Sequence, residues 1–477
     1  MKKLTFPLLL ISIFLFSEAF SYDNIKKDKK TIINSIESQK DRLIEISDNI
    51  WEAAEPALLE FKSSKYLSDY AEENGFRVTR GVAEIPTAFV AEFGSGKPVI
   101  GILGEFDANP GISQKKQPTK EPLVKGAAGH GCGHNLYGTG SLGAAIAIKE
   151  MIESGEISGT IRFYGTPAEE TIFAKVWMVR AGLFDDVDVC MDWHPSDEVE
   201  AATQSSKALV DFRLRFFGDA SHASGDPWNG NSAVDAMELY TTGLNYYREH
   251  VRPTARIHYD IEKAGDVVNV VPDFAQIWTR LRENDKENVN ILYERAKKIA
   301  EAASMMANVD YEMELISGIY EIIPNRFGAG IIQENIESLG EIKYTEDEIN
   351  YANTILKETG KELKGIDSKI RPIRPTLPAQ GGSTDVGDVS QVVPVVRMRA
   401  TAAAKDGPWH SWAVVACTGM SIGHKGMIYA SKALAMTMLD LYKNPKLIDG
   451  VKKEFIARKG DRVYVPQIPP GPPKLVD

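Results

Sequence analysis

Four apolar segments between residues 87 and 195 constrain the fold of this chain more than any other feature of its sequence. They read TAFVAEFG, PVIGILGEFD, GTIRFYGTPAEE and DVDVCMDWHP, and most end in polar side chains. Helical stretches separate them, NLYGTGSLGAAIAIKEMIESG and TIFAKVWMVRAG. Such alternation is typical of an α/β sheet whose strands are buried on both faces. We therefore predict an α/β fold with a helix-flanked mixed sheet, and reactive side chains at the carboxyl ends of its strands.

The pattern changes near residue 205. Polar and apolar residues alternate in VDFRLRF and in QIWTRLRE, as in strands with one buried face, and helical stretches at 231–249 and 287–306 accompany them. We expect a smaller α+β domain over residues 205–320, inserted between the two parts of a catalytic domain, residues 22–204 and 321–477. The second part ends in a proline-rich tail, PQIPPGPPKLVD, which should be extended and lie on the surface.

The first 21 residues have the pattern of a secretory signal peptide. Lys2 and Lys3 precede the apolar run LTFPLLLISIFLF, and the small residues Ala19 and Ser21 fit a cut before Tyr22. The run is short for a bilayer span, and no second apolar stretch follows it. We expect a secreted or periplasmic protein that has no membrane association after signal cleavage.

Charge and cysteine content narrow the classes of function. The chain has 66 acidic and 55 basic side chains, so nucleic acid is not an expected partner. Its three cysteines form no disulfide framework, although a pair between Cys190 and Cys417 stays open. The sequence has no G-x-S-x-G, no P-loop and no strand–GxGxxG–helix. Serine-hydrolase, nucleoside-triphosphate and dinucleotide functions therefore have no support.

The segment GHGCGHN indicates a metal site. Cys132 and His134 stand two residues apart among glycines that allow a sharp turn, just before a helix. Cysteine, histidine and carboxylate side chains are the ligands of zinc and similar divalent metals. Each side chain alone has a structural explanation, because a single cysteine is often a small buried apolar residue and a single histidine is often just hydrogen-bonded. Together they predict a metal centre, whose candidates are Cys132, His134, Glu169, Glu170, His194 and His410.

Two adjacent carboxylates in TPAEE can divide the work at such a centre. Glu169 and Glu170 follow a predicted strand, and Pro167 makes a turn plausible that lets both side chains reach one place. One carboxylate can then ligate a metal, and the other can act as general base toward a water molecule.

These segments resemble the dinuclear metallo-aminoacylase and carboxypeptidase family, which includes amidohydrolases of N-acyl amino acids. GEFDANPGISQ, HGCGHN, TPAEE, MDWHP, DASHAS and VVNVVPD follow one another in the family's order. The resemblance covers nearly all of the chain after residue 21. It implies a catalytic domain that holds two divalent metal ions, zinc or manganese, and an inserted domain that dimerises and closes over the site.

The resemblance also implies roles for single residues. Cys132 would bridge the two metals, Glu169 would be the general base, and His222 would steady the oxyanion, often from the partner protomer. The remaining metal ligands would be His134, Glu170, His194 and His410, the substrate carboxylate would meet Asn269 and Arg282, and Ser383 and Thr384 would line the substrate pocket.

The implied reaction is hydrolysis of the amide bond of an N-acyl or aroyl amino acid such as p-aminobenzoyl-glutamate. An exported dipeptidase, an aliphatic aminoacylase of the same family and a catalytically silent binding subunit are the alternatives. The expected partners are a small-molecule substrate and a second copy of the chain, and a complex with a related second subunit also stays open.

Overall fold

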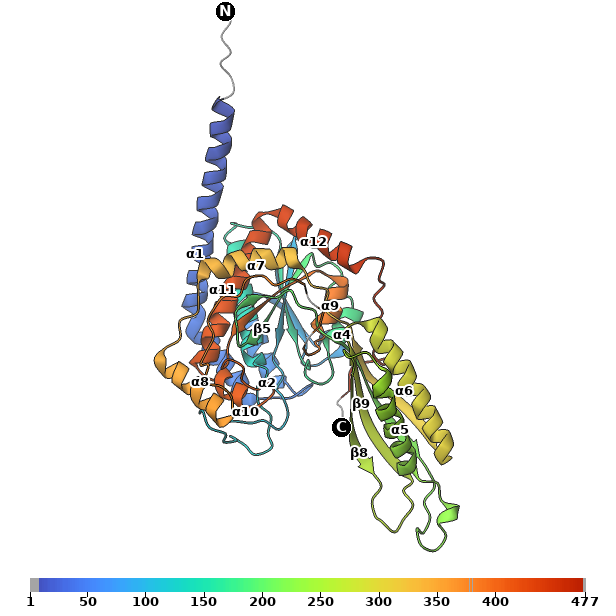
Figure 1. The fold of residues 1–477 in the computed structure, drawn as a ribbon. Coiled ribbons are helices and arrows are strands. Elements are labelled where there is room, and N and C mark those ends of the chain that lie inside the picture. Colours follow the sequence, from blue (N-terminus) through green and yellow to red (C-terminus); the bar gives the residue numbers. More distant parts are fainter. Residues whose placement is uncertain (1–7, 377, 380, 475–477) are drawn as a thin grey trace, which may run out of the picture.

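The structure is a computed structural model, and it describes residues 8–376, 378–379 and 381–474, with side chains from residue 25 onward. Two β-sheets organise the chain (Figure 1). One has seven strands in the order β1-β2-β4-β3-β5-β11-β6, and the other has four in the order β10-β7-β9-β8. The prediction of an α/β catalytic domain with an inserted α+β domain is therefore confirmed.

The large sheet is mixed, because its four central strands are parallel and its outer strands are antiparallel. β3 pairs in parallel with β4 and β5, and β5 pairs in parallel with β11. All seven positions of β3 are buried, as expected for a strand covered on both faces. The strands are β1 (Arg77–Arg80), β2 (Phe89–Gly94), β3 (Val99–Glu105), β4 (Thr160–Thr166), β5 (Val189–Ser196), β6 (Glu200–Ala201) and β11 (Val395–Thr401).

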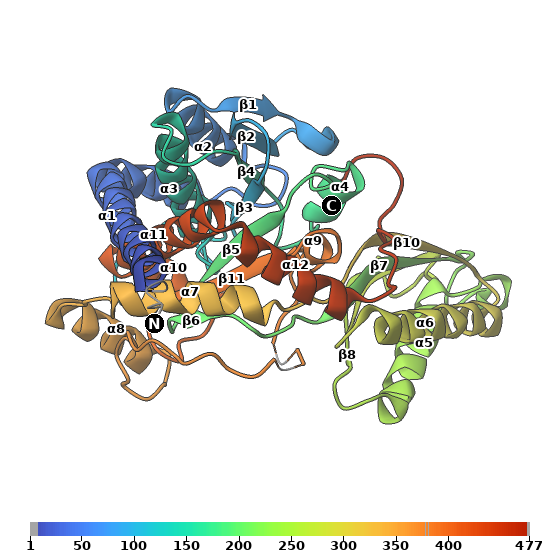
Figure 2. The same ribbon diagram turned by 90° about the horizontal axis from the view of Figure 1, so that it is seen from above.

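Helices cover both faces of this sheet (Figure 2). The helices of the catalytic domain are α1 (Leu8–Ala53), α2 (Phe61–Glu73), α3 (His134–Glu153), α4 (Lys175–Arg180), α7 (Arg326–Leu339), α8 (Glu346–Glu358), α9 (Val386–Val392), α10 (Trp412–Thr418), α11 (Ser421–Lys443) and α12 (Pro445–Lys459). Short 3-10 helices lie at Val82–Glu84, Pro227–Asn229 and Arg248–His250.

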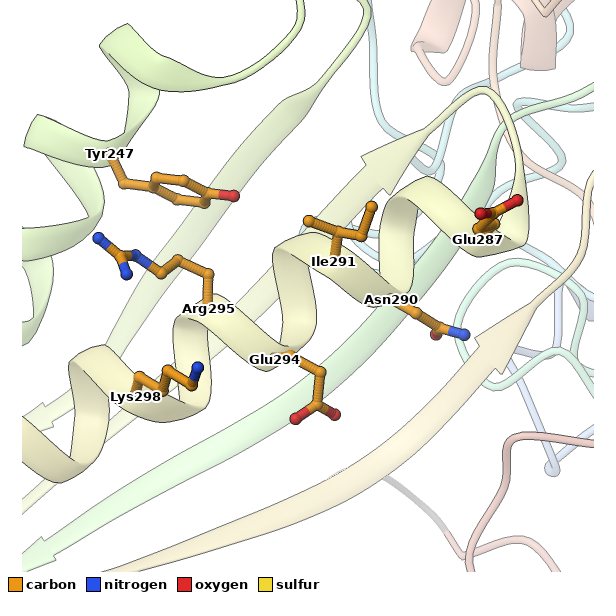
Figure 3. A pocket seen from close by; sticks show the side chains of 7 residues that line it. All are labelled: Tyr247, Glu287, Asn290, Ile291, Glu294, Arg295 and Lys298. Carbon is orange, nitrogen blue, oxygen red and sulfur yellow. The ribbon is translucent and has the colours of Figure 1, made fainter.

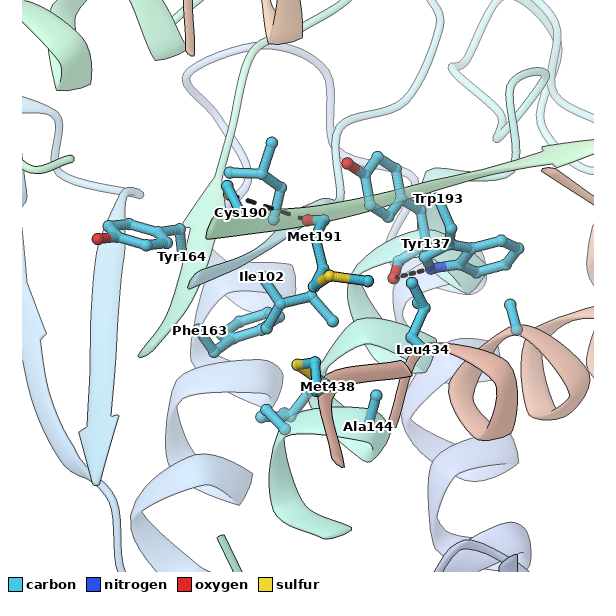
Figure 4. Close-up of a cluster of buried hydrophobic side chains, with 14 of the residues drawn as sticks. Ile102, Tyr137, Ala144, Phe163, Tyr164, Cys190, Met191, Trp193, Leu434 and Met438 are labelled. Carbon is cyan, nitrogen blue, oxygen red and sulfur yellow. Dashed lines mark hydrogen bonds between the residues drawn. The ribbon is translucent and has the colours of Figure 1, made fainter. Parts of the chain in front are cut away.

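The core lies where α3 and α11 meet the sheet (Figure 4). The indole of Trp193 donates a hydrogen bond to the backbone oxygen of Tyr137 at 3.1 Å, which ties β5 to α3. A Cβ on Gly138 would lie 2.7 Å from the backbone oxygen of Glu105, so glycine lets α3 approach β3 closely. This close contact sets the beginning of α3 beside the carboxyl end of β3.

The inserted domain is formed by β7 (Ala208–Phe217), β8 (Arg256–Ala264), β9 (Phe274–Glu283) and β10 (Asp310–Ile319), with α5 (Ala233–Tyr247) and α6 (Lys286–Ala307). Alternate residues of β7, such as Val210 and Phe212, are buried against the helices. Asp211 and Arg213 lie on the opposite face of the same strand. Every strand of this antiparallel sheet falls within the 205–320 range predicted for the inserted domain.

The predicted signal peptide, residues 1–21, falls partly outside the described residues, which begin at 8. From Leu8 the chain runs in one helix, α1, to Ala53, and the N-terminal part of α1 projects from the body (Figure 1). Cleavage before Tyr22 stays a prediction. Within the described part of the chain, no helix combines the length and the apolar character needed to cross a membrane.

Residues 460–474, here called the C-terminal strap, run from α12 across the boundary between the two domains (Figure 2). Trp177 on α4 donates its indole hydrogen to the Gly471 oxygen at 3.0 Å. Gln467 forms an isolated β-bridge with Gly318 of β10, and Tyr320 donates to the Val465 oxygen at 3.2 Å. The strap therefore contacts both the catalytic and the inserted domain.

Candidate metal centre

The candidate ligands come from four places in the fold. Cys132 and His134 flank Gly133, whose φ of 77° is a left-handed turn, and His134 begins α3. Glu170 follows β4, and His194 lies in β5. His410 follows β11 with a φ of 53°, and its N–H donates to the Gly131 oxygen at 3.1 Å. That bond holds the late segment against the GHGCGHN turn.

The ligand atoms fall into two groups that share one residue. Cys132, His134 and His194 place their ligand atoms within 4.8 Å of one another, and so do Cys132, Glu170 and His410. The thiol thus stands between two potential metal positions, as a bridging ligand would. All five side chains that the sequence predicts as metal ligands are in these two groups.

Several buried polar atoms at this place lack hydrogen-bond partners. Among the described side chains these include Glu105 Oε2, His134 Nε2 and Glu170 Oε1. His134 Nε2 is 3.0 Å from Glu105 Oε2 and 3.9 Å from Glu170 Oε1, yet neither contact has hydrogen-bond geometry. Buried polar atoms without partners are costly, and a cation between them would satisfy all three. The residues therefore fit a divalent metal.

Neighbouring groups fix how His134 and His194 face the centre. Asp107 Oδ1 accepts a hydrogen bond from His134 Nδ1 at 2.8 Å, and Asp107 Oδ2 accepts from the Glu170 N–H at 2.8 Å. His194 Nδ1 donates to the Pro195 oxygen at 2.7 Å, and its Nε2 lies 3.5 Å from Cys132 Sγ. In both rings Nε2 stays available as a metal ligand, in the arrangement common for metal-bound histidines.

Burial and charge set the protonation of the site. Burial, followed by the charges of Glu105 and Glu170, raises the pKa of Glu169 well above its usual range. Burial and His134 lower the pKa of His194 to about 3, so its imidazole is neutral and can ligate a metal. Burial and the Glu170 charge raise the pKa of the Cys132 thiol. A thiolate there needs a neighbouring cation.

A turn next to the site positions Glu169. Ala168 precedes it with a φ of 58°, and the Ala168 N–H donates to Glu60 Oε1 at 2.9 Å. Glu60 Oε2 accepts from the Thr87 hydroxyl at 3.0 Å. Burial and the Asp107 charge raise the pKa of Glu60 to about 8. The predicted break after Pro167 is thus a turn, and the Glu60 carboxylate stabilises it by accepting the hydrogen bond from the Ala168 N–H.

Sequence reasoning missed a buried ion network behind the ligands. Lys175 Nζ lies 2.6 Å from Glu105 Oε1 and 2.7 Å from Asp385 Oδ1, and its side chain is 0% exposed. Glu105 also belongs to a third group of potential ligands, with His134 and Glu169. The only signal in the sequence is a charged residue inside an apolar run, Glu105 in VIGILGE and Lys175 in AKVWM.

A cavity of about 440 Å³ opens beside the metal centre. Among its lining residues are Cys132, Glu169, Glu170, His194 and His410, together with Arg282, Ser383 and Thr384. The structure thus brings three of the predicted substrate-binding residues to the ligands. The inserted domain contributes Arg280 and Arg282 to the wall, and β11 contributes Arg397 and Arg399.

His222 and Asn269 lie elsewhere. They are neighbours, since Ala223 N–H donates to the Asn269 oxygen at 3.1 Å and His222 forms a β-bridge with Val270. Their loops, which follow β7 and β8, lie at the end of the inserted domain away from the large sheet (Figure 1). Neither residue lines the cavity of its own chain.

A second hollow of about 510 Å³ lies on the outside of the inserted domain, along α6 (Figure 3). Arg295 stacks over the Tyr247 ring at 5.6 Å from its centre. The residues that line this hollow are Tyr247, Glu287, Asn290, Ile291, Glu294, Arg295 and Lys298. The lining contains no cysteine or histidine, so this hollow is not a candidate for the metal centre.

The sequence of the chain from residue 101 to residue 410 matches the family model described as Peptidase family M20/M25/M40. This chain belongs to that family. M20 membership makes it a metallo-amidohydrolase, and together with the donor set it indicates divalent metal ions as cofactors.

Two relatives match nearly the whole chain. It is 36% identical over 452 residues to the B subunit of p-aminobenzoyl-glutamate hydrolase of Escherichia coli, covering 89% of this chain and 94% of that protein. It is 29% identical over 441 residues to Xaa-Arg dipeptidase of Mus musculus, covering 90% and 92%. The predicted resemblance to a family of dinuclear metal-dependent amidohydrolases and peptidases is thereby confirmed.

A solved structure shares the M20 fold. The crystal structure of a Bacillus subtilis protein, a dinuclear metal-binding peptidase from the M20 family, superposes with a TM-score of 0.57 and 19% identity. The match covers 85% of this chain and 99% of that one. At this identity the likeness concerns the fold alone.

Proposed function

We propose that this protein hydrolyses the amide bond of N-acyl or aroyl amino acids, with p-aminobenzoyl-glutamate as the reference substrate. One observation carries the proposal: two ligand groups that share Cys132 open into the same cavity as the buried carboxylate of Glu169. The relationship to the E. coli aminobenzoyl-glutamate hydrolase subunit supports the choice of substrate.

The donor set suits two zinc or manganese ions. Cys132 would contribute to both, His134 and His194 to one, and Glu170 and His410 to the other. When bound, the ions supply Lewis acidity that lowers the pKa of a water molecule and polarises the scissile carbonyl.

Glu169 acts as general base in this proposal. Its pKa is raised by burial and by neighbouring carboxylates, which suits a group that accepts a proton and gives it back. It takes a proton from the attacking water and delivers it to the leaving nitrogen. Arg282, whose buried Nε has no hydrogen-bond partner among the described residues, receives the substrate carboxylate, and Ser383 and Thr384 line the same cavity.

A homodimer completes the site in this proposal. His222 and Asn269 do not reach the cavity of their own chain, so we assign them to the cavity of a partner subunit, where His222 steadies the oxyanion. Beside them lie exposed apolar side chains, Trp228 at 77% and Val268 at 99% exposure, a surface that a partner would cover. The E. coli relative is named as a subunit, which supports a related second subunit as the other assembly.

We propose that the predicted signal peptide, residues 1–21, directs the protein out of the cytoplasm, so that it is secreted or periplasmic. The basic start and the small residues before Tyr22 support it. Cell fractionation with N-terminal sequencing tests it, and an exported chain that starts at Tyr22 is the expected result. A cytoplasmic chain that keeps Met1 would contradict it.

An exported dipeptidase is the second candidate function, since the mouse relative is named for that activity.

The metal content of the mature protein tests the core of the proposal, measured beside hydrolysis of p-aminobenzoyl-glutamate. We expect about two metals per chain, fewer in Cys132→Ser, and no change in Cys190→Ser, whose buried thiol lies outside the ligand groups. Glu169→Gln should keep its metals and lose about 100- to 10,000-fold in kcat. A metal-free wild type, or a Glu169→Gln enzyme with near-full activity, would refute the proposal.

A further inference from the structure

Four arginines that are not candidate metal ligands line the cavity beside the metal centre. Two of its arginines, Arg280 and Arg282, lie on β9 of the inserted domain, and two, Arg397 and Arg399, lie on β11 of the catalytic domain. Guanidinium groups therefore stand on both walls of the space that a substrate would enter.

Two of these arginines are matched by buried carboxylates. Arg280 Nε donates to Asp211 Oδ2 at 3.0 Å, and the Asp211 side chain is 0% exposed. Arg397 Nε donates to Asp192, which also accepts a hydrogen bond from the Tyr137 hydroxyl. These pairs hold the walls of the cavity in place and leave little charge for a ligand.

The other two arginines are less well matched. Arg282 forms no ion pair with any residue that the structure describes, and its Nε is buried without a hydrogen-bond partner. Arg399 Nη1 lies 3.2 Å from Glu200 Oε1, and Arg374 Nε lies 3.4 Å from the other oxygen of the same carboxylate. Glu200 is thus shared, and the Arg399 side chain stays 36% exposed.

The strand register puts Arg399 close to the chemistry. Arg399 of β11 is the direct neighbour of His194 in β5, and side chains of paired residues lie on the same face of a sheet. A substrate whose scissile bond lies at the metal ligands would thus have Arg399 on one wall and Arg282 on the other.

We propose that Arg399 is a specificity-determining residue that binds a second carboxylate, on the side chain of the leaving amino acid, while Arg282 binds its α-carboxylate. The substrate class is then an amide of an acidic amino acid. Arginine binds carboxylates through paired, charge-assisted hydrogen bonds, and a cationic side chain would meet like charge on both walls. This inference rests on the proposed hydrolysis of amides such as p-aminobenzoyl-glutamate, and it adds which residue of the cavity selects the acidic side chain.

The test compares p-aminobenzoyl amides of glutamate, of its neutral isostere glutamine, and of lysine. We expect the metal-loaded wild type to favour the glutamate amide over the glutamine amide by about 10- to 100-fold in kcat/KM, the range for a hydrogen bond to a charged group. Arg399→Gln should lower kcat/KM for the glutamate amide by a similar factor and leave the glutamine amide within about twofold. Arg399→Lys should keep part of the preference, because the charge remains.

Arg374→Gln is the matched control, since Arg374 contacts the same Glu200 carboxylate but does not line the cavity. It should keep the preference for glutamate. If Arg399→Gln keeps the preference for the glutamate amide, or if Arg374→Gln abolishes that preference equally, the role inferred for Arg399 is wrong. The proposed amide hydrolysis is not affected by either result.

Calorimetric binding of the same three amides separates the two proposals. If wild type binds the glutamate amide, Arg399→Gln does not, and no amide is hydrolysed, the proposed carboxylate subsite stands and the proposed reaction is refuted. Wild type that prefers neither glutamate over glutamine nor glutamine over lysine, in binding or in turnover, would overturn the subsite.

Discussion

Replacing Lys175 by methionine should destabilise the protein strongly. The Lys175 amine lies 2.6 Å from a carboxylate oxygen of Glu105 and 2.7 Å from one of Asp385, and all three side chains are at most 1% exposed. Methionine fills a similar volume but removes the one cation that, among the described residues, contacts both of these buried carboxylates. Removing one partner of a buried ion pair costs about 3–5 kcal/mol, and here two partners are left uncompensated.

The loss should depend on pH, with a definite sign. Burial raises the pKa of Glu105 to about 7, against the favourable charge of Lys175, and burial also raises the pKa of Asp385. A buried acid with a raised pKa contributes stability that is lost as pH rises through its folded pKa. Without Lys175 both pKa values rise further. The free energy of unfolding of the variant should therefore be lower than that of wild type by about 3–5 kcal/mol at about pH 8. At about pH 5.5, where the carboxyls are protonated, the loss should be less than half as large.

Urea unfolding of the full chain in the presence of EDTA measures this effect, because chelation removes any contribution of bound metal. Lys175→Met combined with Asp385→Asn should recover part of the stability, since one uncompensated charge is removed. A loss below about 1 kcal/mol at the higher pH, or a loss that grows on acidification, would refute the view that Lys175 neutralises two buried charges.

Three further predictions concern the surroundings of the site. Asp107→Asn should weaken metal affinity about 10- to 100-fold in a metal titration, because Asp107 orients His134, and unchanged affinity would contradict that role. The melting temperature of Glu60→Gln should rise relative to that of wild type as pH rises through about 8. The reason is that the buried wild-type carboxyl, whose pKa is raised to about 8, becomes charged in that range. A constant difference in melting temperature between about pH 6 and about pH 9 would contradict this. Gly138→Ala should cost about 1–3 kcal/mol in urea unfolding, because its Cβ would meet the Glu105 oxygen at 2.7 Å. The control Gly330→Ala, with nothing within 4 Å, should be neutral or stabilising.

The sequence predicts the sheet, and it predicts the local part of the candidate metal centre from one short motif. Apolar segments followed by polar residues predict where β3, β4 and β5 end, and the ends of parallel strands meet at one edge. Cys132 and His134 stand two residues apart, so their joint placement depends on one turn. The division of the ligands around Cys132 then follows from the fold.

Other parts of the site depend on contacts that no local pattern contains. Lys175 is separated by 70 residues from Glu105 and by 210 from Asp385, and a lysine in an apolar helix does not by itself predict which carboxylates it meets. His222 and Asn269 match family motifs, but a motif does not tell whether a loop reaches the cavity of its own chain. The arginines of β11 are inconspicuous in sequence, since VVRMRAT is an ordinary alternating strand.

The C-terminal strap has a consequence for how the cavity is assembled. Arg282 and Arg399 lie on different domains, so the distance between them depends on how those domains are held together. Residues 460–474 supply part of that hold, through Trp177 on one side and Gly318 on the other. A ribosome makes this segment after every residue of both domains. Because this segment supplies part of the hold between the domains, we expect a tag or a proteolytic trim at this end of the chain to change the spacing of the proposed carboxylate-binding walls. Such a change would alter substrate choice without altering any residue of the cavity.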